Sequence, residues 1–182
     1  MAVWNVIDHT EVGASGIVAY EETSISGSYD HLCLIASARS DTIDAGAYVA
    51  QSYIQLNGDT GTNYSRVHLN AGSTTAQSGT DTGIAYLSFQ YGTCGPSTLA
   101  DTFGTYELWI PNYANTTGQK QLFSKWSIPN NSTTDWQWYI GHTAGLWAST
   151  AAITAIKLYP AHASTKYDQY STFTLYGING AG

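Results

Sequence analysis

The sequence predicts an all-β protein, a single-domain antiparallel β-sandwich of the jelly-roll type with about nine strands. Three observations lead to this prediction. Short runs of β-branched and aromatic residues with period-two alternation recur along the whole chain. Clusters of Gly, Asn, Asp and Ser, which favour turns, separate these runs. Charged residues make up only 10% of the chain, so hydroxyl and amide side chains supply most of its polarity.

The length of 182 residues fits one domain with one hydrophobic core. We expect residues 1–15 to form an N-terminal arm or strand and residues 16–182 to form the jelly-roll domain. Such a core needs neither a disulfide nor a metal. Cys33 and Cys94 are therefore interpreted as two free thiols in a reducing compartment.

Eleven segments have strand character, and one or two of them are expected to be wrong or fused. They are Ala2–Ile7, Gly16–Glu21, His31–Ala38, Tyr48–Leu56, Ser65–Asn70, Ala85–Tyr91, Thr105–Pro111, Gln121–Ile128, Trp136–His142, Ala152–Tyr159 and Thr172–Ile178.

The clearest alternation lies in Thr105–Pro111, which predicts a strand with one buried face. Its apolar positions are Tyr106, Leu108 and Ile110, and the positions between them are Thr105, Glu107 and Trp109. Two tracts read as loops, Asn57–Asn63 and Asn70–Gly83. The second is long and has few apolar residues, so we expect either a mobile excursion or an interaction arm.

The net charge of −7 and the pI near 4.9 argue against binding to nucleic acid or to an anionic membrane, because both require clustered Lys and Arg. No stretch approaches the roughly 20 apolar residues of a membrane span. The first residues have no basic segment followed by a long apolar one, so we expect synthesis in a cytosol.

No pattern of catalytic residues emerges, and we expect neither an enzyme nor a cofactor nor a metal site. The chain contains no glycine-rich phosphate loop and no G-x-S-x-G nucleophile motif. Arg39, near Asp41 at a strand end, is interpreted as a structural fork that binds a carboxylate or carbonyl groups. The segment Asn57-Gly58-Asp59 is interpreted as a structural turn rather than a calcium loop.

A group of aromatic residues between Trp126 and Trp147 is the strongest candidate for recognition. Sugars stack on such rings, but aromatic residues are also enriched in cores and in subunit interfaces. All three interpretations stay open. The candidates for an interface or a ligand site are Trp126, Trp136, Trp138 and Trp147, with Val3, Trp4 and Val6 of the N-terminal arm.

Several stretches together resemble small virion proteins of tailed bacteriophages and prophages. They are Tyr29-Asp30-His31-Leu32, Ser37-Ala38-Arg39-Ser40-Asp41, Leu56-Asn57-Gly58-Asp59-Thr60-Gly61-Thr62-Asn63-Tyr64, Ile110-Pro111-Asn112-Tyr113, Gly145-Leu146-Trp147, Ala152-Ile153-Thr154-Ala155-Ile156 and Phe173-Thr174-Leu175-Tyr176-Gly177-Ile178. The likeness spans roughly residues 16–178 and consists of turn and strand signatures.

The resemblance implies a virion structural protein, assembled in the host cytoplasm, that decorates and cements the outside of the phage head. It implies the major capsid protein or another virion protein as partner, and a homo-oligomer with a trimer favoured. In such an assembly the arm formed by residues 1–7 would pair with a neighbouring chain by strand addition. The alternative is a tail-associated receptor-binding module that binds host-surface glycans.

Overall fold

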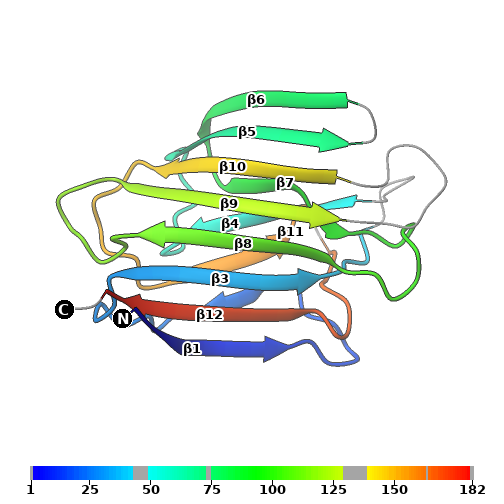
Figure 1. Cartoon of the computed structure of the whole chain (residues 1–182), viewed down its shortest axis with the longest axis horizontal. Coiled ribbons are helices and arrows are strands. Elements are labelled where there is room, and N and C mark those ends of the chain that lie inside the picture. The colour runs from blue at the N-terminus through cyan, green and yellow to red at the C-terminus, as the bar shows by residue number, and fades with distance from the viewer. Residues whose placement is uncertain (1, 43–48, 73–74, 129–138, 163, 181–182) are drawn as a thin grey trace.

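The protein is a sandwich of two antiparallel β-sheets (Figure 1). The computed structural model describes residues 2–42, 49–72, 75–128, 139–162 and 164–180. In chain order the described strands are β1 (Val3–Glu11), β2 (Tyr20–Glu22), β3 (His31–Ala38), β4 (Val49–Leu56), β5 (Tyr64–Gly72), β6 (Thr75–Ile84), β7 (Leu87–Cys94), β8 (Gly104–Pro111), β9 (Lys120–Ile128), β10 (Tyr139–Trp147), β11 (Ile156–Pro160) and β12 (Thr172–Asn179). The predicted all-β, antiparallel sandwich is confirmed.

The two sheets differ in size. The larger has eight strands in the order β1-β12-β3-β8-β9-β10-β5-β6, and the smaller has four in the order β2-β11-β4-β7. Figure 1 looks onto the larger sheet, with β1 along one edge and β6 along the other. Because the smaller sheet has half as many strands, the larger sheet extends beyond it.

The strand count is higher than the expected nine, because the described residues alone form twelve strands. Each of the eleven predicted segments overlaps one of them. The additional strand is β6, which lies in the tract predicted as a loop. Most of its side chains are exposed on both faces, so it lacks the alternation that marks a half-buried strand. It is a strand because it pairs with β5 along its whole length, from Tyr64↔Ile84 to Gly72↔Thr75.

The hydrophobic core lies between the sheets and follows the period of two. In β4 every second residue, from Ala50 to Leu56, is buried, and β9 alternates in the same way from Lys120 to Ile128. Phe173 of β12 lies at the centre, where its ring stacks on Tyr20 at 5.1 Å and meets Tyr167 edge-on at 4.8 Å. The other side of each strand in the larger sheet therefore points away from the core.

Candidate interaction surface

The face of the eight-stranded sheet that points away from the smaller sheet, called the outer face below, carries many large apolar side chains. Their exposed fractions lie between 43% and 60%. They are Trp4, Val6, Ile35, Val67, Leu69, Phe123 and Ile140. Side chains of paired antiparallel residues share a face, and the registers therefore place these residues together.

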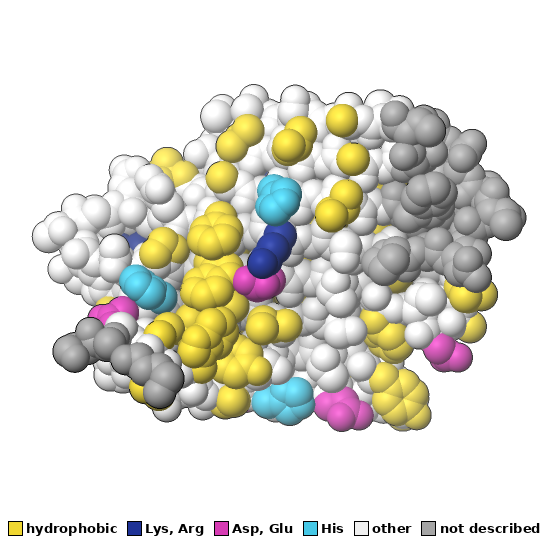
Figure 2. Space-filling view, in the orientation of Figure 1, with side chains coloured by type: hydrophobic (Ala, Val, Ile, Leu, Met, Phe, Trp, Pro, Cys, Tyr) yellow, Lys and Arg dark blue, Asp and Glu magenta, His cyan; other side chains and the backbone are white. Residues whose placement is uncertain are grey.

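Four rings form a continuous aromatic stripe across this face, consisting of Trp4, Tyr176, Trp109 and Phe123. Trp4 meets both Trp109 and Tyr176 edge-on, each at 5.4 Å between ring centroids. Trp109 stacks on Phe123 at 6.1 Å with the ring planes 2° apart. Figure 2 shows the stripe as the yellow column that crosses β9, β8, β12 and β1.

Cys33 lies beneath this stripe. It pairs with Tyr176 on one side and Trp109 on the other, so its side chain points to the outer face, yet it is fully buried. Burial, with a smaller contribution from Glu107, raises the pKa of its thiol to about 12. The thiol is therefore protonated at neutral pH and is a poor nucleophile.

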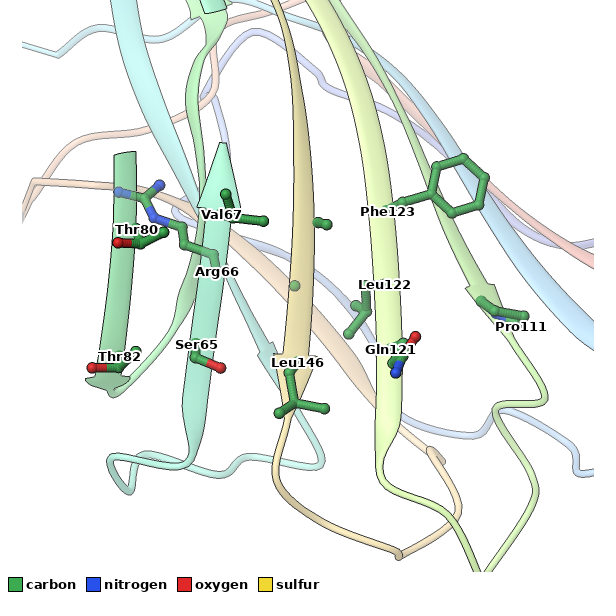
Figure 3. A pocket seen from close by; sticks show the side chains of 12 residues that line it. Ser65, Arg66, Val67, Thr80, Thr82, Pro111, Gln121, Leu122, Phe123 and Leu146 are labelled. Carbon is green, nitrogen blue, oxygen red and sulfur yellow. The ribbon is translucent and has the colours of Figure 1, made fainter. Parts of the chain in front are cut away.

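A groove runs along β10 next to the stripe and has a volume of about 480 Å³. Its floor is formed at Ala144, whose small outward-pointing side chain leaves the space open. Figure 3 shows Val67 of β5 and Phe123 of β9 on either side of β10. The polar residues that line the groove are Ser65, Thr80, Thr82 and Gln121, together with Arg66, which is paired with Asp81 at 2.6 Å.

The outer face is nearly neutral. At its described positions from β12 to β6 the charged side chains are Glu107 and Lys125, which form an ion pair at 3.2 Å. Glu107 also accepts a hydrogen bond from the indole nitrogen of Trp109. If another protein covers the outer face, Glu107 and Lys125 therefore remain paired with each other.

The N-terminal candidates are divided between the two faces of β1. Trp4 and Val6 lie on the outer face, whereas Val3, 53% exposed, alternates to the other side. The arm is paired within its own chain, because β1 lies alongside β12 over its whole length. Strand addition through residues 1–7 would therefore have to use the open edge of β1.

Two of the four tryptophan candidates lie in the core. Trp126 and Trp147 are each 3% exposed, because both occupy inward positions of their strands. They cannot stack on a glycan or contact another subunit in this fold, so those interpretations are withdrawn for them. Trp136 and Trp138 lie outside the described residues.

Three residues of the aromatic stripe were not among the sequence-based candidates. They are Trp109, Phe123 and Tyr176. Each occupies the solvent-facing phase of an alternating strand, which is the signal that could have identified it.

Arg39 connects the loop that follows β7 to the segment that precedes β12. Its guanidinium donates to the Thr98 hydroxyl at 2.8 Å and to the carbonyl oxygens of Leu99, Thr102 and Pro96 at 3.1, 3.2 and 3.3 Å. Asp168 lies 3.6 Å away. These contacts hold two distant segments together.

Asp41 lies close to the same region. Its carboxylate accepts a hydrogen bond of 2.6 Å from the backbone of Lys166. Burial raises the pKa of Asp168, and the negative charge of Asp41 adds to this rise, while Arg39 opposes it. These hydrogen bonds and ion pairs fix the loop after β7 and the segment before β12 to the end of β3, so we interpret Arg39 and Asp41 as structural.

Asn57, Gly58 and Asp59 form a turn after β4. Asn57 and Gly58 have φ values of 52° and 67°, and the amide of Asp59 donates to the carbonyl of Leu56. The Asn57 side chain accepts from the backbone amides of Thr154 and Ala155 and donates to the carbonyl of Ala152. The turn thereby fixes the segment that enters β11.

The Asp59 carboxylate accepts hydrogen bonds from three different residues. Its carboxylate accepts from the Trp147 indole at 2.7 Å, from the Asn63 amide at 2.9 Å and from the Gly61 backbone at 2.8 Å. The bond from Trp147, followed by that from Asn63, lowers the pKa of Asp59. Both carboxylate oxygens are used within the chain, which favours the structural interpretation.

This arrangement predicts a pH-dependent contribution to stability. Because the pKa of Asp59 is lower in the folded state, the ionised carboxylate stabilises the fold above its unfolded pKa of about 4, and this contribution is lost as the pH falls through the folded value. The stability difference between the wild type and D59N, measured by urea unfolding, should therefore shrink below about pH 4. In W147F, which lacks the indole donor, the D59N substitution should produce a smaller pH dependence. Equal pH dependence in both backgrounds would contradict this assignment.

Among the described residues, no three His, Cys, Asp or Glu side chains gather closely enough to hold a metal ion. Within the described ranges, no helix is long and apolar enough to cross a membrane. No protein-family model matches the sequence, and no curated protein is significantly similar to it.

Proposed function

We propose that this protein is a phage virion structural protein, a jelly-roll decoration or cement protein that binds the outside of the head. It acts without chemistry, by burying apolar surface against other virion subunits. The single observation that carries this proposal is the outer face, whose apolar side chains are up to 60% exposed. Exposed apolar patches of this kind mark protein interaction sites.

The strand order supports the jelly-roll assignment. When the β5–β6 and β9–β10 segments are set aside, the remaining strands form two sheets of four, β1-β12-β3-β8 and β2-β11-β4-β7. The chain then changes sheet at every step from β1 to β12 except one, from β4 to β7, which are neighbours in the smaller sheet. A jelly roll has eight strands in two sheets, and here two additional strand pairs widen one of them. The widening enlarges the outer face.

Electron microscopy of virions that carry an epitope-tagged copy of the protein tests the proposed location. Gold label at many symmetric positions on the head is the expected result. Particles that lack the protein should then lose their DNA at a lower temperature than complete particles, because the contacts that cement the shell are absent. Label confined to the tail, or particles of unchanged stability, would contradict the decoration function.

The groove favours one alternative, a tail-associated module that binds host-surface glycans. Phe123 offers an exposed ring, and the hydroxyl and amide groups around it are suitable partners for sugar hydroxyls. Under this alternative, label would cluster at the tail and the protein would bind saturably on a glycan array. F123A would lose that binding while keeping the stability of the wild type. Absence of array binding would exclude the alternative for the glycans tested.

A further inference from the structure

We propose that the outer face is the contact surface for a second copy of this chain, in a two-fold dimer in which Phe123 of each copy enters the groove of the other. This inference rests on the proposed function, in which the outer face is buried against other virion subunits. It identifies one such subunit as a second copy of this chain. It can be tested in solution, independently of the virion.

The outer face is large enough for a stable dimer. Eight strands about 4.8 Å apart and roughly eight residues long present a face of about 1,000 Å². A stable interface needs about 800 Å² from each partner, so this face alone is sufficient. Aromatic and aliphatic side chains are exposed across it, as in the core of an interface, with hydroxyl and amide side chains between them.

The distribution of charge favours contact through the same face. The chain carries a net charge of −7, so two copies repel each other over most of their surface. Glu107 and Lys125 cancel on the outer face, and the other charged residues that the structure describes lie elsewhere, apart from Glu11 at the end of β1 and the Arg66–Asp81 ion pair beside the groove. Contact through the outer face therefore brings together two surfaces whose described charges nearly cancel.

The shape of the face favours two-fold symmetry. Phe123 is 49% exposed, and the groove begins directly beside it, because Ala144 pairs with Phe123 across β9 and β10. A half-exposed ring and a groove side by side on one face are the elements of a self-complementary surface. A two-fold axis between them makes both contacts at once, whereas a ring of three copies would need two different surfaces. The resemblance implied a trimer, and this geometry points to a dimer.

Analytical ultracentrifugation of the purified full-length protein between about 1 and 100 µM tests the dimer, with two variants that leave the core untouched. A144W fills the groove with a side chain that points away from the core, and F123A removes the exposed ring beside it. Each is expected to raise the dimer dissociation constant by about tenfold or more. A100W is the matched control, because Ala100 is an exposed loop residue, and it should dimerise as the wild type does.

The dimer should persist in about 1 M salt, since an apolar contact is not screened. Circular dichroism and thermal unfolding should show that A144W and F123A fold normally. A wild type that stays monomeric at about 100 µM, a trimer, or variants that associate like the wild type would each overturn the inference. A dimer without label on virions would leave the inference standing and would overturn the proposed function.

Discussion

Replacing Trp126 by alanine is expected to destabilise the protein by about 3–5 kcal/mol. Trp126 is 3% exposed, and its ring meets that of Tyr91 at 6.1 Å. A Cβ atom placed on Gly141 would clash with the same ring, so the indole rests directly on the backbone of β10. Truncation would leave a cavity between the sheets that the surrounding strands cannot fill. Urea unfolding at neutral pH measures the loss.

Two variants test this explanation. W126F keeps most of the ring and removes an indole N–H that lacks a hydrogen-bond partner among the described residues, so it should cost less than W126A by about 2 kcal/mol or more. F123A truncates an exposed ring of the outer face and should change stability by less than about 1 kcal/mol. If W126A and F123A lost similar amounts of stability, the assignment of Trp126 to the core and of Phe123 to the surface would be contradicted.

The burial of Trp126 also affects how binding experiments are interpreted. A W126A variant that loses glycan or particle binding would do so because its fold is weakened, since the indole is not accessible. Variants of Phe123 and Ala144 change the outer face directly and leave the core intact. They are the informative substitutions for every interaction proposed above.

Replacing Arg39 by alanine is expected to cost about 3–4 kcal/mol. The guanidinium is largely buried and donates to four oxygen atoms of the loop after β7, with Asp168 nearby. Without it those acceptors lose their donors, and the partly buried carboxyl of Asp168 loses the positive charge that opposes the rise in its pKa. Thermal and urea unfolding measure the effect.

R39K retains the positive charge, but a lysine ammonium cannot donate to as many oxygen atoms at once as the planar guanidinium does. It should therefore recover less than half of the stability lost in R39A. K125A is the matched control, because it breaks the ion pair with Glu107, in which Lys125 is 55% exposed. Exposed ion pairs contribute little, and a loss below about 0.5 kcal/mol is expected. A loss from R39A as small as that from K125A would contradict the role of Arg39 in joining the two segments.

The candidate surface illustrates which features short-range patterns can predict. In Thr105–Pro111 the alternation showed that Tyr106 and Trp109 lie on opposite faces, and that holds in β8. The pattern therefore indicated that Trp109 is an aromatic residue on the solvent-facing side of its strand. Its ring neighbours could not be predicted, because Trp4, Phe123 and Tyr176 come from strands far apart in the chain. Only the order of strands in the sheet brings them together.

The sequence by itself determined the all-β class, the approximate positions of eleven strands and the alternation of faces within them, because these depend on interactions between near neighbours in the chain. The tertiary structure decided the remaining features. It placed Trp126 inside and Phe123 outside, since a period of two defines two faces and only the packing of the sheets selects the buried one. It made β6 a strand, since hydrogen bonds to β5 compensate for a polar sequence. It also assembled the outer face from both ends and the middle of the chain, because sheet order depends on long-range pairing.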